Sequence, residues 1–385
     1  MTRSKRRPCS GADRALALLL ATICWLAGAC TAPSAVVSPP AQPTLAPLGI
    51  PALPQTPAEP AQIYQRIAPA IAFIETDWGT GSGFLVDMGS QQYVVTNSHV
   101  VRPFAAARVV FPNGLELLDT PLVDWDLIAD LAVLGPVTTT IPSLSITEGQ
   151  RQPVGAYVYL VGYPGESEAM PQPTLARGLI SNVRQWKNAE LTYYQTDAST
   201  VGGQSGGVLV SADGQIIGIP TFWFGEPGAF GLALLTADAW PRLQRLVAGE
   251  DVDGLGQRRA LLDDATERIT LAVGDVVAGN IDYANDVDIF LIELQEGQRI
   301  AVLVESMGLD PMVSMGSTKA SEAELEFDDD SGRGIFGTDA KLAFEAAEAG
   351  NYMIIVQNNT PETGAYLISI QETPGTEPEA ESSGS

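Results

Sequence analysis

Histidine, cysteine and basic residues are all scarce in this chain. Its 385 residues include one histidine, His99, and three cysteines, Cys9, Cys24 and Cys30. Because no cysteine follows Cys30, the chain beyond it cannot form an intrachain disulfide or a thiolate metal site. Acidic residues outnumber basic ones 46 to 21 overall, and 28 to 7 from residue 250 onward. This charge excludes nucleic acid and anionic lipid headgroups as expected partners.

The start of the chain is predicted to be an export signal. Ala15–Ala29 is an apolar run of 15 residues, which is short for a membrane span and typical of the apolar core of a signal peptide. Basic residues precede it, and it ends in the string LAGAC. That string resembles a bacterial lipobox, with Ala27 where such boxes usually have Leu, so Cys30 is the predicted lipidation site. Ordinary signal cleavage nearby is the alternative.

Composition divides the remainder into a spacer, two strand-rich units and a tail. Residues 31–60 are rich in Pro and Ala, which predicts an extended linker. Residues 61–249 contain many short β-branched and aromatic runs between Gly-rich turns, followed by one helix, a pattern that favours antiparallel barrels. Residues 260–372 show the alternation of a β-sandwich. Residues 373–385 are polar and acidic and are predicted to be disordered.

One residue of each type that a catalytic triad requires occurs in a suggestive string. His99 lies in VVTNSHVV, Asp130 in ADLAVL and Ser205 in GGQSGG. A serine hydroxyl needs an imidazole to take its proton, and the imidazole needs a carboxylate to fix its tautomer. The glycines around Ser205 would let the amides of Gly203 and Ser205 form an oxyanion hole. GQSGG also matches the nucleophile elbow of α/β-hydrolases, but that fold requires a histidine after the serine, and none follows Ser205.

Residues from about 63 to 247 resemble the trypsin-like serine proteases, in particular the bacterial HtrA/DegP type. The strings GTGSGFLVD, YVVTNSHVV, DLAVL, TDASTVGGQSGG and GQIIGI carry the resemblance. It implies two six-stranded β-barrels with the active site between them, and it assigns the triad to His99, Asp130 and Ser205. Gln204 stands where the family usually has Asn or Asp, which argues against activation by insertion of a new N-terminus. No PDZ domain, usual in the HtrA type, is seen.

The same resemblance predicts the substrate-binding residues. Ser199 falls near the base of the primary pocket, and Thr221, Phe222 and Trp223 fall on the strand that usually lines the cleft. Ser199 is small and uncharged, so cleavage after small or medium apolar residues is expected, and Trp223 would narrow the pocket further.

The C-terminal unit resembles the bacterial pre-peptidase C-terminal domain through GDVVAGNID, DVDIFLIELQEGQ and EAGNYMIIVQNNTPETGAYLISI. The resemblance implies a jelly-roll-like β-sandwich attached to a secreted peptidase, with roles in secretion or surface binding. The acidic run Glu322–Gly334, or Asp286 and Asp288, could ligate calcium. The alternative is a solvated acidic surface. No zinc spacing or phosphate-binding loop is present, and no other cofactor is expected.

We therefore expect an all-β protein that acts as an extracytoplasmic serine endopeptidase on proteins or peptides through an acyl-enzyme. It would face outside the cytoplasm, either anchored to the membrane through lipid on Cys30 or secreted. The alternative is a catalytically retired protease fold that serves as a binding or scaffold module at the cell surface.

Overall fold

The computed structural model describes residues 60–77, 79–146, 151–165, 172–198, 202–224, 230–255, 269–319 and 325–373. The predicted signal with Cys30, nearly all of the predicted linker and nearly all of the tail lie outside these residues, as does Ser199. The side chains of Phe222 and Trp223 also lie outside the described part. Within the described ranges, no helix is both long enough and apolar enough to cross a membrane.

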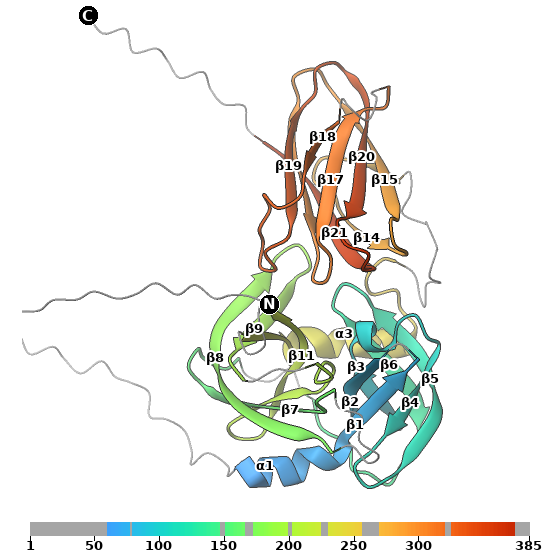
Figure 1. Ribbon diagram of the computed structural model, residues 1–385, viewed down its shortest axis with the longest axis vertical. Helices are drawn as coiled ribbons and strands as arrows, with labels where there is room; N and C mark the ends of the chain where they lie inside the picture. Colours follow the sequence, from blue (N-terminus) through green and yellow to red (C-terminus); the bar gives the residue numbers. More distant parts are fainter. Residues whose placement is uncertain are drawn as a thin grey trace, which may run out of the picture. The chain divides into compact units, whose positions relative to one another are not determined.

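The first barrel contains six antiparallel strands that close in the order β1-β2-β3-β6-β5-β4 (Figure 1). Apolar side chains are buried on both faces of its strands, and Phe84, Leu85, Val94 and Val133 are fully buried. The strands are β1 (Ile71–Thr76), β2 (Gly79–Met88), β3 (Gln91–Thr96), β4 (Ala106–Val110), β5 (Glu116–Asp126) and β6 (Leu131–Val137).

The second barrel closes in the order β10-β11-β12-β9-β8-β7, again with antiparallel pairing. Its core is equally apolar, with Leu160, Leu209 and Leu234 fully or almost fully buried. The strands are β7 (Tyr157–Gly162), β8 (Thr174–Trp186), β9 (Leu191–Thr196), β10 (Val208–Ser211), β11 (Ile216–Phe224) and β12 (Phe230–Leu235).

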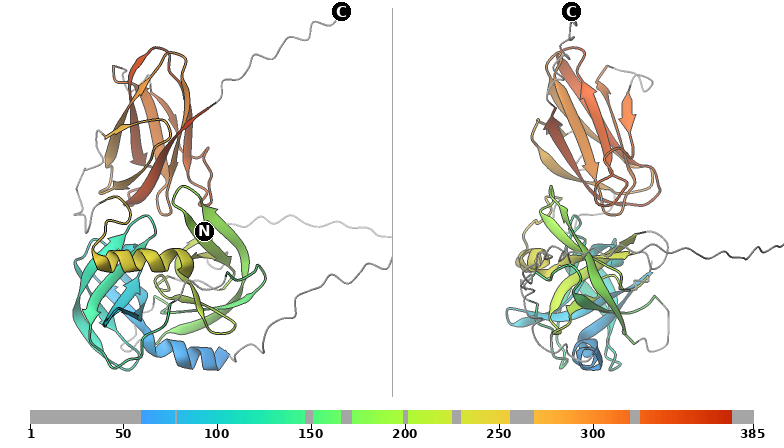
Figure 2. Two further views of the ribbon diagram at one scale, coloured as in Figure 1. Left: turned by 180° about the vertical axis from the view of Figure 1, so that it is seen from behind. Right: turned by 90° about the vertical axis from the view of Figure 1, so that its left-hand side faces the viewer.

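Short helices flank and join the two barrels. The helix α3 packs against β5 and β6 of the first barrel and against β11 and β12 of the second, and the reverse view shows it lying across both (Figure 2). It ends at Gly249, whose φ of 77° is the left-handed geometry of a helix C-cap. The helical segments are α1 (Pro60–Ile67), η1 (Ala68–Ala70), α2 (Ser98–Val101) and α3 (Thr236–Ala248).

The C-terminal region consists of two sheets around one apolar core. Five strands form one sheet in the order β13-β15-β20-β17-β18, and four form the other in the order β14-β21-β16-β19. Both sheets contribute to the same buried cluster, for example through Phe290, Ile354, Val302 and Ile368. The strands are β13 (Ile269–Leu271), β14 (Val276–Ile281), β15 (Val287–Leu294), β16 (Arg299–Glu305), β17 (Pro311–Ser317), β18 (Glu326–Asp328), β19 (Ala340–Glu345), β20 (Gly350–Asn358) and β21 (Gly364–Glu372).

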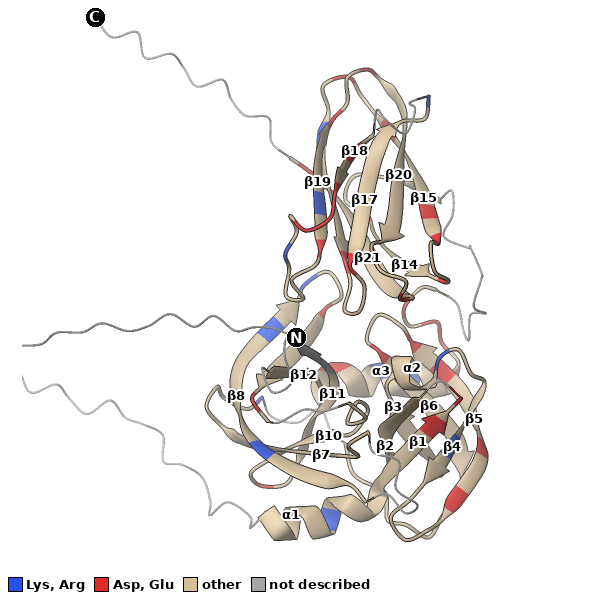
Figure 3. Cartoon of the chain, in the orientation of Figure 1, with Lys and Arg blue, Asp and Glu red and all other residues tan. Residues whose placement is uncertain are grey.

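The all-β prediction, with two six-stranded barrels and a further strand-rich region, is therefore confirmed. Figure 3 marks Asp and Glu positions in red and Lys and Arg positions in blue along the chain; from residue 250 onward, Asp and Glu outnumber Lys and Arg 28 to 7.

Candidate active site

His99 is positioned by a short helix that begins where β3 ends. β3 finishes at Thr96, and α2 starts at Ser98, so His99 stands on the first turn at the rim of the first barrel. Asn97, between β3 and α2, connects this segment to the Asp130 turn, because its Nδ2 donates a 2.7 Å hydrogen bond to the backbone carbonyl of Asp130. The His99 side chain keeps 44% of its surface exposed, so it is accessible to a reactant.

Asp130 lies in the turn between β5 and β6 and is almost completely buried. Its φ of 53° is in the left-handed region, which Asp tolerates better than most residues. Four donors surround its carboxylate. The Nδ1 atom of His99 lies 2.7 Å from Oδ2, and the Thr221 hydroxyl donates to the same oxygen. Ser98 Oγ and the His99 backbone N–H donate to Oδ1 at 2.8 Å and 3.0 Å.

This geometry fixes the tautomer of the imidazole. An ionised carboxylate can only accept hydrogen bonds, so Nδ1 of His99 carries the proton and Nε2 is left able to accept one. Burial by itself would lower the pKa of His99, but the charge and hydrogen bond of Asp130 outweigh it and raise the pKa above 6.5. Burial opposes ionisation of Asp130 too, yet His99 and Thr221 hold the pKa of that carboxyl below its usual value.

Ser205 lies on the loop that enters β10, and Thr221 connects it to Asp130. The Ser205 hydroxyl donates a 3.3 Å hydrogen bond to the carbonyl of Thr221, whose own hydroxyl donates to Asp130. The loop turns at Gly203 and Gly206, whose φ values of 91° and 80° favour glycine. A Cβ at Gly206 would stand 2.2 Å from the Ser82 carbonyl oxygen, so no larger residue fits there. Thr221 thus contacts both Ser205 and Asp130, and Asp130 in turn contacts His99.

The predicted oxyanion-hole residues also lie on this loop. In the described part of the chain, the backbone N–H groups of Gly203 and Ser205 donate no hydrogen bond to another residue. Gln204 between them is buried, and its Nε2 donates a 3.3 Å hydrogen bond to Thr174 Oγ1.

A second group of charges supports the turn that carries Asp130. Asp126 Oδ1 accepts a 2.8 Å hydrogen bond from the Ala129 N–H, and Oδ2 forms a 2.6 Å ion pair with Arg242 of α3. Arg242 also donates to the carbonyl of Ala189, in the turn between β8 and β9. Asp253 accepts a 2.7 Å hydrogen bond from the Leu127 N–H, and burial together with the charge of Asp126 raises the pKa of Asp253 to about 7.

Among the other predicted site residues, Thr221 is buried and contacts Asp130 and Ser205 rather than standing free in a cleft. Asp286 accepts hydrogen bonds from the backbone N–H groups of Asp282 and Val287. Asp288 is buried and accepts one from the Tyr366 hydroxyl. In the described ranges, no group of three or more His, Cys, Asp or Glu side chains is arranged to hold a metal ion.

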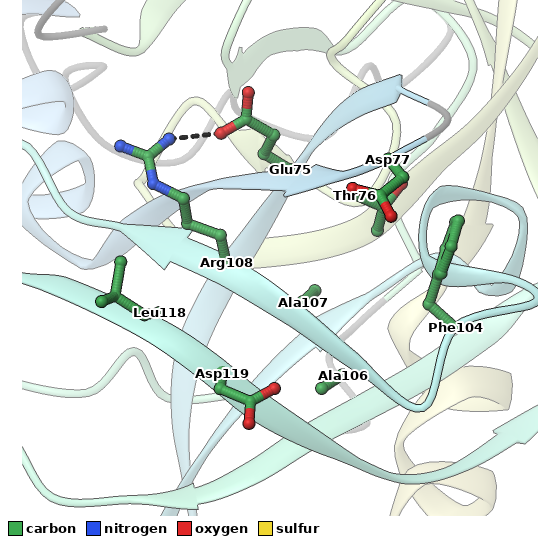
Figure 4. Close-up of a pocket in the computed structure, with 9 residues that line it drawn as sticks. All are labelled: Glu75, Thr76, Asp77, Phe104, Ala106, Ala107, Arg108, Leu118 and Asp119. Carbon is green, nitrogen blue, oxygen red and sulfur yellow. Dashed lines mark hydrogen bonds and ion pairs between the residues drawn. The ribbon is translucent and has the colours of Figure 1, made fainter.

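A separate hollow of about 460 Å³ lies on the outside of the first barrel (Figure 4). None of the predicted site residues lines it. Arg108 points toward Glu75 across it, and the guanidinium also pairs with Glu116, so the main cation of this hollow is already neutralised. The lining residues are Glu75, Thr76, Asp77, Phe104, Ala106, Ala107, Arg108, Leu118 and Asp119.

Comparison with known proteins agrees with this geometry. Residues 81–219 match the family model of the trypsin-like peptidase domain. The chain therefore contains a trypsin-like peptidase domain. It is similar to serine protease HTRA1A of Danio rerio, with 31% identity over 179 residues that cover 42% of this chain and 36% of that protein. It is also similar to a probable periplasmic serine endoprotease DegP-like of Halomonas elongata, with 30% identity over 152 residues that cover 39% and 31% of the two chains.

A crystal structure of the serine endoprotease from Yersinia pestis is 30% identical and covers 50% of this chain and 68% of that one, with a TM-score of 0.44. The two curated relatives above confirm the predicted resemblance to HtrA-type proteases for the peptidase domain. This chain spans only about a third of the length of the two curated relatives above.

Sequence reasoning did not identify several residues that shape the site of the peptidase domain. Ser98 is adjacent to His99 but belongs to no pattern that assigns it a role, and the sequence predicts Thr221 only as a residue that lines the cleft. Ser82, in the string GTGSGF, contacts the loop of Ser205. The only signal that could have identified Ser82 was its place in a string that carries the family resemblance.

The first prediction concerns the protonation of His99. Because His99 is the chain's one histidine, its imidazole gives a single set of NMR signals. We expect its titration midpoint to lie above 6.5, and Asp130→Asn to lower it, because that change removes the charge that favours the imidazolium.

Asp238→Asn is a matched control for this titration. Asp238 accepts a hydrogen bond from the Thr192 N–H and has no contact with His99, so the midpoint should not move. A midpoint that is the same in Asp130→Asn and in the unaltered chain would contradict the prediction.

Proposed function

We propose that the chain is a serine endopeptidase that hydrolyses peptide bonds of proteins or peptides through His99, Asp130 and Ser205. One observation supports this most strongly: the buried Asp130 carboxylate holds His99 Nδ1 at 2.7 Å, and Thr221 connects the same carboxylate to the Ser205 hydroxyl. Relatives named as serine proteases agree with this chemistry.

In the proposed reaction, His99 Nε2 takes the proton of the Ser205 hydroxyl while Oγ attacks the carbonyl carbon of the scissile bond. The tetrahedral intermediate places its negative oxygen at the amides of Gly203 and Ser205. His99 then gives its proton to the leaving amine, and an acyl-enzyme remains on Ser205. Water, deprotonated by His99, attacks the acyl carbon, and His99 returns that proton to Ser205 Oγ as the acid product leaves. Asp130 stays ionised and stabilises the imidazolium throughout.

Two substitutions test this proposal directly. Ser205→Ala removes the nucleophile and His99→Ala removes the base, so each should lower peptidase turnover by about 10⁴-fold or more. Ser205→Ala should keep the melting temperature close to that of the unaltered chain, since Ser205 is only half-buried and donates one 3.3 Å hydrogen bond. His99→Ala should lower it, because it removes a hydrogen-bond donor from the buried Asp130 carboxylate. Turnover of a protein substrate such as casein and of a fluorogenic peptide measures the effect.

Labelling by a fluorophosphonate probe separates this function from the alternative, a retired protease fold that acts as a binding or scaffold module. An active site reacts covalently at Ser205, and Ser205→Ala abolishes the label. If the unaltered chain neither reacts with the probe nor cleaves any peptide, the enzyme proposal is wrong.

We also propose a preference for small or medium apolar residues before the scissile bond. The support is Ser199, which by the family resemblance stands near the pocket base and carries no charge. In a peptide library, cleavage after Val, Ala or Leu should exceed cleavage after Arg or Lys by about 10-fold or more, because an unpaired cation is costly to bury.

Ser199→Asp is the matching variant for this preference. A carboxylate at the pocket base should shift cleavage toward Arg and Lys. Preferred cleavage after Arg or Lys by the unaltered chain would refute the assignment of the pocket.

Finally, we propose export and attachment to the membrane through lipid on Cys30, on the basis of the basic start, the short apolar run and LAGAC. Cys30→Ser should then move the protein from the membrane fraction to the soluble fraction or the medium. Cys24→Ser, inside the apolar run, is the control and should leave fractionation unchanged. Membrane fractionation that Cys30→Ser does not alter would count against lipidation.

A further inference from the structure

The loop that carries Ser205, residues 202–207, is called the nucleophile loop. It is hydrogen-bonded to the first barrel through one buried residue, Ser82 of β2. Ser82 has no exposed surface and lies in the string GTGSGF. Its hydroxyl donates a 2.7 Å hydrogen bond to the carbonyl of Gly203. Its backbone N–H donates a 2.9 Å hydrogen bond to the carbonyl of Ser205. One residue of the first barrel therefore holds two carbonyls of a loop that belongs to the second.

The direction of the Ser82 hydroxyl is fixed by a third contact. The backbone N–H of Tyr163, which follows β7, donates to Ser82 Oγ at 2.8 Å. Because an amide can only donate its hydrogen, Oγ is the acceptor there, and its own single hydrogen goes to Gly203. The carbonyl of Ser82 in turn accepts a 2.7 Å hydrogen bond from the buried Thr96 hydroxyl of β3. Ser82 is thus held from both barrels and has no freedom to turn.

The bonds of Ser82 complete a set in which every carbonyl from Gly202 to Ser205 has a donor. Gly165 N–H donates to the carbonyl of Gly202 at 2.6 Å, and Gly207 N–H donates to that of Gln204 at 3.1 Å. In a trans peptide a carbonyl and the following N–H point in opposite directions. The two bonds therefore direct the amides of Gly203 and Ser205 away from Gly165 and Gly207, as an oxyanion hole requires.

The peptide between Gly203 and Gln204 lies between those two amides, and the Ser82 hydroxyl is what holds it. Gly203 has a φ of 91°, and glycine backbone rotates more freely than any other. Without the Ser82 hydrogen bond, this peptide can rotate about ψ of Gly203 and φ of Gln204. Unless the two rotations cancel, they change the angle between the two oxyanion donors.

We infer that Ser82 is a positioning residue for catalysis: its hydroxyl sets the Gly203–Gln204 peptide so that the amides of Gly203 and Ser205 point at one oxyanion. Ser82 does not touch the reacting atoms. The inference rests on the proposed peptidase function and assigns to Ser82 a role that is expressed in the transition state rather than in the binding of substrate.

Ser82→Ala in the full-length chain tests this role, because it removes the hydroxyl and keeps the backbone bond to Ser205. We expect kcat/KM on a fluorogenic peptide to fall about 10- to 100-fold, within the loss that follows removal of one oxyanion donor. The loss should lie in kcat, with KM nearly unchanged. Affinity for a peptide boronic acid, which places an oxygen in the oxyanion hole, should fall by a similar factor.

Ser211→Ala is the matched control. Ser211 is also buried, and its hydroxyl donates to the Asp213 carboxylate in the turn after β10, away from the nucleophile loop. It should leave kcat and boronate affinity unchanged. Ser82→Cys carries a weaker donor in place of the hydroxyl and should give an intermediate loss of kcat and of boronate affinity. It serves as the second test variant if Ser82→Ala folds poorly.

The possible results separate cleanly. Wild-type kcat and boronate affinity in Ser82→Ala or Ser82→Cys would overturn the inference while leaving the triad intact. A rise in KM with kcat unchanged would also overturn it, because it would show a role in substrate binding. If the unaltered chain is inactive and Ser205 does not react with a fluorophosphonate, the proposed function itself fails, and the role of Ser82 fails with it.

Discussion

The site depends on one buried carboxylate, that of Asp130. Removing an ionised group from water costs several kcal/mol unless donors replace the lost hydration. Here the donors come from α2, through Ser98 and His99, and from β11, through Thr221. The bonds that stabilise the charge are therefore the bonds that orient the imidazole. Since β11 belongs to the second barrel, this compensation also requires the two barrels to be correctly packed against each other.

The turn that carries Asp130 is anchored by a second buried charge. Asp126 pairs with Arg242 of α3, and the same guanidinium donates to the Ala189 carbonyl of the second barrel. A buried ion pair is weak evidence for stability, because desolvation offsets much of the attraction. It does fix geometry, since a guanidinium presents its donors in a rigid plane. We therefore regard Arg242 as a constraint on where the Asp130 turn sits, rather than as a source of stability.

The sequence predicts the fold class, and it proposes three triad residues that the structure connects through Asp130 and Thr221. Strand alternation and Gly-rich turns are local signals, and the single histidine left no choice of base. The roles of Ser82 and Thr221 were not accessible in the same way. They depend on which strand of one barrel faces which loop of the other, and strand register is set by packing across the whole barrel. Ser199 and the Phe222 and Trp223 side chains lie outside the described residues, so those assignments stay predictions.

The contacts also explain why short strings carry the family resemblance when overall identity is near 30%. A Cβ at Gly203 would stand 2.5 Å from the Gly165 nitrogen, and one at Gly206 would stand 2.2 Å from the Ser82 carbonyl oxygen. Gly206 of GGQSGG thus packs directly against Ser82 of GTGSGF, and Gly203 packs against Gly165, with no room for a larger side chain at either glycine. Elsewhere in the barrels a core position accepts several apolar residues of similar volume. At Gly203 and Gly206, where two backbones touch beside the nucleophile, the packing permits only glycine.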